Sequence, residues 1–484
     1  MPLKTGKEYM ESLKKLNPVV YVDGVKIDSV VGHPEIQPHI NAVALTYDMA
    51  NDPLHEELVA TTSHLTGNKI NRFTHVHQSR EDLMAKVKML RLLGQSTGSC
   101  FQRCVGFDAL NATYSTTFDI DQKYGTEYHK RLVDYLIKVQ DEDLMIAGAM
   151  TDPKGDRSLP PSKQKDPDMF VHIVEKNDQG IVIRGAKTHM TGMVNSHEML
   201  IMPTMALKEE DKDYAVCCAL PVDAPGVTHV FGRQTNDKRK YDAMDCGNPK
   251  YGIVGGECLT ILEDVFVPWE RVFMCGESEF AASLVERFAT LHRQNYGGCK
   301  GGVSDVVIGA TATMADYNGA LKASHVQDKL VEMIHLAETM FCCSIACSAE
   351  GVKLPSGAYY PSSLLGNIVK QNVTRHVYEI DRLAHDIAGG LIATLPSERD
   401  WNHPEIGKFM KKYFVGKEDS CTPEERFRIA RLIENMTGGT ALVESMHGAG
   451  SPQAQRVMLA RTGNIEHKMN LARSLAGCKD YQKK

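Results

Sequence analysis

The segment "FVHIVEKNDQGIVIRGAK", residues 170–187, decides the fold class of this chain. Short β-rich runs stand on both sides of the turn-forming run NDQG, a pattern that predicts a β-hairpin. Other short β-rich runs surround it, punctuated by proline and glycine: "EMLIMPTMAL", "DYAVCCALPV", "GVTHVF" and "CLTILEDVFVP". We therefore expect a middle β-domain over residues 148–276.

The sequence on either side of this β-region is helical. In "SREDLMAKVKMLRLLGQ", residues 79–95, Ser79 is a candidate N-cap and the apolar residues recur at helical spacing. Helical periodicity returns after the β-region, for example in "ERFRIARLIENM". Segregated helices and strands predict an α+β fold with an N-terminal helical domain (1–147) and a C-terminal helical bundle (277–484). A doubly wound sheet is disfavoured, since no dinucleotide-binding or P-loop motif occurs.

Composition excludes several classes of protein. The chain has 484 residues, a formal charge of −6 and 24% charged residues, without a basic patch or tail, so we expect no nucleic-acid partner. The apolar runs are shorter than the roughly 18 residues of a membrane span, which predicts no membrane partner. The N-terminus lacks the apolar core of a signal peptide, and several of the thirteen cysteines, an odd number, lie in apolar contexts. A cytoplasmic location is expected.

One cysteine pair stands out from the others. "GQSTGSCFQRCVGFDAL", residues 94–110, places Cys100 and Cys104 four positions apart, so a helix there would put both thiols on one face. Such a pair can bind one metal centre or can simply face a core. Cys343 and Cys347 have the same spacing in the apolar run "MFCCSIACSAEG", where we expect core packing. The more polar surroundings of Cys100 favour a functional site.

The segment "TLHRQNYGGCKGG", residues 290–302, gathers His292, Tyr296, Cys299 and Lys300 between glycine pairs. His292 and Cys299 would share a face of an unbroken helix, but the glycines make a regular helix doubtful and would let the backbone approach a bulky ligand. The two segments together supply three thiols and one imidazole. That ligand set suits a structural zinc site or an iron–sulfur cluster, and the spacings do not decide between them.

Long motifs resemble the 4-hydroxybutyryl-CoA dehydratase family, which is related to the 4-hydroxyphenylacetate 3-hydroxylase flavoproteins. They are "LLGQSTGSCFQRCVGFDA", "GAMTDPKGDRS", "ERFATLHRQNYGGCKGG", "AHDIAGGL" and "ESMHGAGSPQAQR", and the similarity extends over essentially the whole chain. The resemblance implies an acyl-CoA dehydrogenase-like fold with a β-barrel-like middle domain. It also implies a homotetramer whose subunits each hold FAD and a 4Fe–4S cluster, with Cys100, Cys104, His292 and Cys299 as the cluster ligands.

The resemblance also places the flavin. The segment "GAMTDPKGDRS" is similar to the flavin-holding segment of this fold, but differs from the acyl-CoA dehydrogenase pattern in carrying the charged residues Lys154 and Arg157. The residues it implies for FAD are Met150, Thr151, Gly155, Asp156, Arg157 and Thr191.

The implied reaction is the radical dehydration of 4-hydroxybutyryl-CoA to crotonyl-CoA, together with vinylacetyl-CoA Δ-isomerase activity. The C3 hydrogen is not acidified by the thioester, and acid–base catalysis contributes only about 10²–10⁴-fold, which explains the need for two cofactors. His292 is expected as a ligand and base, Tyr296 as a proton or hydrogen-bond donor, and Glu444 as the acid–base partner at the hydroxyl. Glu257 and Lys300 are further active-site candidates, and Gln102 is a candidate for substrate contact or for support of the ligands.

Three other functions compete with this one. A flavin-dependent aromatic monooxygenase of the same fold would lack the cluster and leave Cys100, Cys104 and Cys299 as idle thiols. A non-catalytic protein with a structural zinc site would bind no FAD. An isomerase alone would move the double bond of vinylacetyl-CoA without expelling water.

Overall fold

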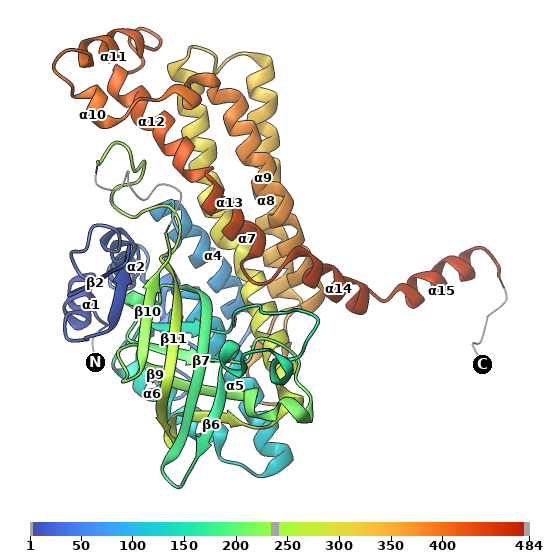
Figure 1. Cartoon of the computed structure of the whole chain (residues 1–484). Helices are drawn as coiled ribbons and strands as arrows, with labels where there is room; N and C mark the ends of the chain where they lie inside the picture. The colour runs from blue at the N-terminus through green and yellow to red at the C-terminus, as the bar shows by residue number, and fades with distance from the viewer. Residues whose placement is uncertain (1–2, 234–241, 479–484) are drawn as a thin grey trace.

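The computed structural model describes residues 3–233 and 242–478, and its N-terminal helices, middle sheets and long helical bundle follow one another along the chain (Figure 1). The predicted hairpin is confirmed: β6 and β7 pair antiparallel, with Ile173 opposite Ile183. Its turn is closed by the Asn177 side chain, which accepts from the backbone N–H groups of Gln179 and Gly180. The middle strands are β5 (Ile146–Ala149), β6 (His172–Lys176), β7 (Gly180–Thr191), β8 (Glu198–Ile201), β9 (Val216–Pro221), β10 (Val227–Phe231), β11 (Glu257–Pro268) and β12 (Val272–Cys275).

These strands form two sheets. The larger has the order β2-β1-β10-β11-β7-β6, and the smaller has the order β12-β9-β8-β5. Within the described residues both sheets are open, so the middle domain is a pair of sheets and not a closed barrel. The pairing of β7 with β11 contains a bulge between the Thr260–Lys187 pair and the Cys258–Met190 pair. This bulge lies where β7 reaches the cavity described below.

The N-terminal region is mostly helical, but it also contributes strands to the larger sheet. The hairpin of β1 and β2, joined by Asp23 and Gly24, pairs in parallel with β10. The sequence interpretation missed this hairpin, although a two-residue Asp-Gly turn is a common hairpin signal. The elements are α1 (Gly6–Leu13), β1 (Val19–Val22), β2 (Val25–Ile27), α2 (Gln37–Ala50), α3 (Glu56–Val59), β3 (Ala60–Thr62), β4 (Lys69–Asn71), α4 (Arg80–Thr97), α5 (Cys104–Tyr124) and α6 (Tyr128–Asp141).

The C-terminal region is a bundle whose centre is α7, a helix of 40 residues. Two short helices continue away from the bundle to the C-terminus (Figure 1). The elements are α7 (Ser278–Tyr317), α8 (Ser324–Ala349), β13 (Val352–Lys353), β14 (Tyr359–Tyr360), α9 (Ser363–Ala388), α10 (Glu398–Trp401), α11 (Gly407–Tyr413), α12 (Pro423–Met436), α13 (Gly439–His447), α14 (Pro452–Thr462) and α15 (Ile465–Leu475).

The glycine pairs of α7 do not interrupt the helix, so the expectation of irregular backbone was wrong. They also do not make room for a ligand, because neighbouring helices occupy that space. A Cβ atom at Gly298 would lie 2.5 Å from the carbonyl oxygen of Val87 on α4, and one at Gly297 would lie 2.3 Å from that of Met340 on α8. Glycine is required here because three helix backbones approach closely.

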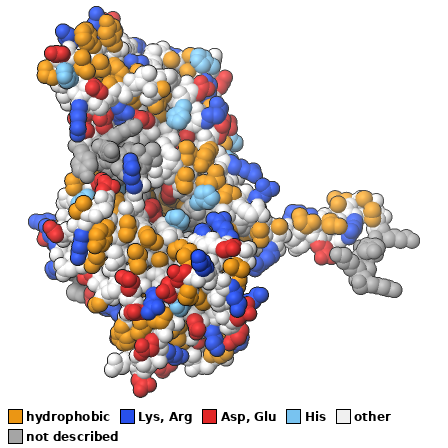
Figure 2. Space-filling model, viewed as in Figure 1, with side chains coloured by type: hydrophobic (Ala, Val, Ile, Leu, Met, Phe, Trp, Pro, Cys, Tyr) orange, Lys and Arg blue, Asp and Glu red, His pale blue; other side chains and the backbone are white. Residues whose placement is uncertain are grey.

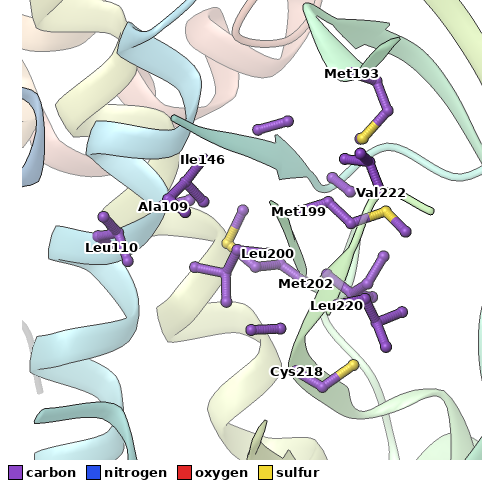
Figure 3. Packing of buried hydrophobic residues seen from close by; sticks show 14 of the residues in the cluster. Ala109, Leu110, Ile146, Met193, Met199, Leu200, Met202, Cys218, Leu220 and Val222 are labelled. Atoms are coloured by element: carbon purple, nitrogen blue, oxygen red, sulfur yellow. The ribbon is translucent and has the colours of Figure 1, made fainter. Parts of the chain in front are cut away.

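The largest hydrophobic core joins the N-terminal helices to the sheets. Side chains of α5, β5, β8 and β9 meet in it, including Ala109, Ile146, Leu200 and Leu220 (Figure 3). A second core lies among α7, α8, α9 and α12. The functional residues predicted from α5, β7 and α7 are therefore carried on well-packed elements.

Helix α8 is long and apolar enough, by length and composition, to cross a membrane. Of an apolar stretch of 18 residues in this helix, 39% is buried within the protein. It packs against α7 and α9. The expected absence of a membrane partner stays a prediction.

Candidate active site

A cavity of about 860 Å³ lies where the sheets meet the helical bundle. In the space-filling view the molecule is hollowed between these parts, with histidine and basic side chains at the edge (Figure 2). Twelve of the fifteen predicted site residues line this cavity: Cys100, Cys104, Met150, Thr151, Arg157, Thr191, Glu257, His292, Tyr296, Cys299, Lys300 and Glu444. Residues from all three regions of the chain thus converge on one site.

Three predicted residues are not among those lining the cavity. Gln102 is fully buried; its amide nitrogen donates to the carbonyl oxygens of His39 and Cys100, and its oxygen accepts from Asn195. These bonds favour support of the cysteine loop over substrate contact. Asp156 instead accepts hydrogen bonds from Ser158 in an exposed turn, and Gly155 precedes it with a φ of +52°.

Helix α7 supplies four of the predicted residues from one side. His292, Tyr296 and Lys300 follow each other at four-residue spacing, so an unbroken helix presents them in a row toward the cavity, with Cys299 beside Lys300. The rings of His292 and Tyr296 meet edge to face, with centroids 5.5 Å apart. The helical periodicity therefore assembles this half of the site.

Cys100 and Cys104 do not lie on successive turns of one helix, contrary to the conditional expectation. Helix α4 ends at Thr97, and Gly98 closes it in the left-handed conformation with a φ of +57°. Cys100 lies in the following loop, and Cys104 is the first residue of α5. Both thiols still reach the cavity because the loop turns back, with Gln102 at a φ of +66°.

The three thiols lie close enough to influence one another. Burial raises the pKa of Cys104, and the neighbouring Cys100 and Cys299 raise it further. Burial also raises the pKa of Cys100, and it raises that of Cys299 to about 11 although Lys300 acts in the opposite direction. Cysteine ligands bind metals as thiolates, so a positively charged centre would be needed to hold all three deprotonated.

The donor types around the cavity bear on the kind of metal centre that it could hold. Among the described residues, no three His, Cys, Asp or Glu side chains are close enough to hold a single metal ion. A four-iron cluster binds each ligand at a different iron and so needs a wider set of donors. The three thiols and the imidazole that line this cavity are donor types that an iron–sulfur cluster takes.

His292 is anchored on the side away from the cavity. Its Nδ1 atom lies 2.8 Å from Oδ2 of Asp108, which also accepts from the side-chain amide of Asn295. The other carboxylate oxygen of Asp108 accepts from Lys86 at 2.9 Å. The sequence interpretation missed these residues, although Lys86 was visible as a charge on the apolar face of a predicted helix.

The polar wall of the cavity contains an ion pair and a neutral carboxyl group. Lys300 donates to Glu444; burial lowers the pKa of Lys300, but Glu444 and the nearby thiols raise it above its ordinary value overall. Burial raises the pKa of Glu257 to about 8, despite its hydrogen bonds from Thr191 at 2.8 Å. At neutral pH the Glu257 carboxyl group is therefore mainly protonated and available as a donor.

Two further titratable residues lie at this site and were not predicted. Lys370 places its ammonium 3.7 Å from the ring centre of Tyr296, and burial lowers its pKa to about 7. Asp381 lines the cavity, and burial raises its pKa to about 7. Both come from α9, whose contribution depends on how the bundle packs.

The predicted flavin segment forms part of the cavity wall and is held from behind. Lys187 donates to the carbonyl oxygen of Met150 at 2.9 Å and pairs with Asp152 at 2.8 Å, in a site where both side chains are almost completely buried. The backbone N–H of Thr188 also donates to the carbonyl oxygen of Thr151. These bonds fix Met150 and Thr151 against the cavity.

Comparisons with known proteins agree with this architecture. The family described as 4-hydroxyphenylacetate 3-hydroxylase N terminal matches residues 5–274, and the corresponding C-terminal family matches residues 281–477. A 4-hydroxybutyryl-CoA dehydratase/vinylacetyl-CoA-Δ-isomerase of Clostridium aminobutyricum is 56% identical over 99% of this chain and 100% of its own length. The chain belongs to the 4-hydroxybutyryl-CoA dehydratase family.

Solved structures give the same grouping. An oxygen-tolerant archaeal 4-hydroxybutyryl-CoA dehydratase from N. maritimus is 52% identical, with a TM-score of 0.97 over 100% of this chain and 97% of that chain. The oxygenase component of 4-hydroxyphenylacetate 3-monooxygenase complexed with FAD is 25% identical, with a TM-score of 0.86 over 98% of each chain. Glutaryl-CoA dehydrogenase, at 12% identity, shares the fold with a TM-score of 0.51 over 80% of this chain and 81% of its own. The acyl-CoA dehydrogenase-like fold is thereby confirmed.

Proposed function

We propose that this protein dehydrates 4-hydroxybutyryl-CoA to crotonyl-CoA, and isomerises vinylacetyl-CoA, with FAD and a 4Fe–4S cluster. The observation that carries the proposal is the convergence of Cys100, Cys104, His292 and Cys299 on the cavity that also holds the Lys300–Glu444 pair. The names of its close relatives support the same reaction. When bound, FAD and the cluster would supply one-electron chemistry and a Lewis acid for the hydroxyl oxygen.

Each cofactor has a matching set of residues. The three thiols and the free side of His292 would hold the cluster, while Met150, Thr151, Arg157 and Thr191 would hold the flavin on the other wall. The cavity volume of about 860 Å³ provides room for a large ligand. The FAD complex of the related monooxygenase supports a flavin in this fold.

The protein side chains would handle the protons. Nδ1 of His292 contacts Asp108, so only Nε2 is available to the cavity. Nε2 would therefore have to bind iron and accept a proton at different times. Burial raises the pKa of Tyr296, so its phenol would stay neutral and donate. Glu257 would also act as a donor, whereas Glu444, oriented by Lys300, would serve acid–base work at the hydroxyl.

Anaerobic purification tests the proposal directly. We expect a yellow protein with about four irons and four acid-labile sulfides per subunit, since each 4Fe–4S cluster is bound by one set of four ligands. It should form crotonyl-CoA from both 4-hydroxybutyryl-CoA and vinylacetyl-CoA. Flavin without iron would support the monooxygenase alternative, and turnover of vinylacetyl-CoA alone would support an isomerase.

We further propose a homotetramer and a cytoplasmic location. In support of assembly, α15 extends from the body with its apolar side chains exposed: Ile465 by 61%, Leu471 by 53% and Leu475 by 91% (Figure 1). Several large apolar side chains exposed on one helix are typical of an interface between proteins. All thirteen cysteines lie in the described residues as free thiols, which agrees with a reducing compartment. Light scattering would test the assembly, with a mass near four times 53.6 kDa expected.

A further inference from the structure

A completely buried ion pair lies behind His292 and joins three helices. Lys86 on α4 and Asp108 on α5 are both 0% exposed, with 2.9 Å between Nζ and Oδ1. Lys86 also donates to the carbonyl oxygen of Leu291 on α7, at 3.2 Å. Burying two charges so deeply is rarely a net source of stability, because both lose their hydration. The pair therefore calls for an explanation in terms of the site beside it.

The contacts of Asp108 determine which nitrogen of His292 carries the proton. A carboxylate paired with lysine can only accept, so Nδ1 of His292, at 2.8 Å from Oδ2, must be the donor. The side-chain amide of Asn295 also lies 3.5 Å from Nδ1, but Nδ1 carries its own proton toward Asp108 and so cannot accept from it. Nε2 is left as the nitrogen with a free lone pair, on a ring that lines the cavity.

Stacking holds the plane of the same ring. Phe288, one turn earlier on α7, lies against His292 with centroids 5.4 Å apart and an interplanar angle of 14°. Stacking alone leaves the ring free to flip by 180°, which would exchange the two nitrogens. The hydrogen bond to Asp108 removes that freedom. A carboxylate behind the imidazole is the arrangement that fixes tautomer and orientation in metal-binding histidines.

We propose that Asp108, held by Lys86, is a positioning residue that keeps His292 with Nδ1 protonated and Nε2 directed into the cavity. The proposal rests on the proposed function only for the identity of the metal that Nε2 would bind. Lys86 has two tasks: it balances the buried carboxylate, and its bond to Leu291 ties the pair to the backbone next to His292. The arrangement thus prepares one ligand before any cofactor enters.

The test uses two double variants that both remove the buried charges. Lys86→Met/Asp108→Asn keeps an oxygen that can accept from Nδ1, whereas Lys86→Met/Asp108→Leu does not. Removing both charges together avoids an unpaired buried ion, which would be strongly destabilising. Crystal structures of both variants without iron, and the rate at which the loaded proteins lose iron to a chelator, are then compared.

We expect His292 to keep one orientation in the Asn variant and to rotate or become disordered in the Leu variant. Iron loss should be about 10–100-fold faster in the Leu variant, the usual effect of removing such a partner. An unchanged His292 and equal iron loss in the two variants would overturn the proposal. If the wild-type protein bound no iron, the cluster function would fail, but the orientation of His292 in the iron-free crystals would still decide this inference.

A measurement on the unaltered chain covers the case in which the Leu variant does not fold. ¹⁵N spectra of protein labelled in histidine, with His292 assigned by its loss in His292→Gln, report the tautomer directly. We expect a protonated Nδ1 and an unprotonated Nε2. The opposite tautomer would contradict the proposal.

Discussion

Lys300 on α7 and Glu444 on α13 form an ion pair that connects two walls of the cavity. Their side chains are 11% and 21% exposed, so both charges are largely shielded from water and each is stabilised by the other. The pairing orients the carboxylate toward the site and ties the short helix α13 to the long helix α7.

Glu444→Gln should therefore lower kcat for dehydration by about 10²–10⁴-fold, the usual contribution of one acid–base group. Iron and flavin contents should stay unchanged, because Glu444 is not a predicted ligand. Glu279→Gln, on α7, is the control, since Glu279 also pairs with a lysine, Lys123, but in a largely exposed position. Kinetic assays and iron analysis of both variants check this, and full activity of Glu444→Gln would exclude an acid–base role.

Cys299→Ala should remove the cluster and the dehydration activity together. The thiol lines the cavity beside Lys300, and three remaining donors would not complete a four-ligand centre. Cys347→Ala is the control, because Cys347 is fully buried in the core of the bundle and does not line the cavity. Iron analysis and the visible spectrum decide; retention of four irons by Cys299→Ala would refute the ligand assignment.

Gly298→Ala should destabilise the protein by about 1–3 kcal/mol through overpacking. The added methyl group would meet the backbone of α4, 2.5 Å from the carbonyl oxygen of Val87. Gly309, on the same helix, has open space where a methyl group would lie, with no neighbouring atom within 4 Å, so Gly309→Ala should instead stabilise by about 0.5–1 kcal/mol. Urea unfolding of both variants measures the difference, and equal effects would argue against close packing at Gly298.

Asp381 should make the stability of the protein depend on pH. Burial raises its pKa from 3.8 to about 7, while Lys300 opposes the shift, so the folded protein keeps a proton that the unfolded chain releases. This contribution is present at low pH and is lost as pH rises through about 7. Relative to Asp381→Asn, the wild type should lose up to about 1.4 kcal/mol per pH unit between roughly pH 4 and 7.

Urea unfolding at several pH values measures this dependence. Asp386→Asn provides the control on the same helix, because Asp386 pairs with Lys329 and its pKa is lowered. Relative to Asp386→Asn, the wild type should therefore gain stability as pH rises, and only in the acidic range. A constant difference between wild type and Asp381→Asn from pH 4 to 7 would contradict the assignment.

Local patterns were sufficient for most of the fold. The β-rich runs on both sides of the turn "NDQG" predicted the β6–β7 hairpin, and the spacing in "SREDLMAKVKMLRLLGQ" predicted α4 with Ser79 as its N-cap. Patterns failed where a residue had two local interpretations. Glycine pairs in α7 suggested broken backbone, whereas their neighbours in space, α4 and α8, make them helix-packing positions.

The sequence by itself determined the order of helices, strands and helices, which depends on residue type and short-range spacing, and the family, which depends on long motifs. The cluster ligands stay a prediction from the resemblance to that family. Only the tertiary structure decided that Cys100 and Cys104 approach from a loop and a helix start, that Lys300 meets Glu444, and that Asp108 and Lys86 stand behind His292. These last contacts join residues 22 to 184 positions apart, and the packing of separate helices, which local periodicity does not encode, brings them together.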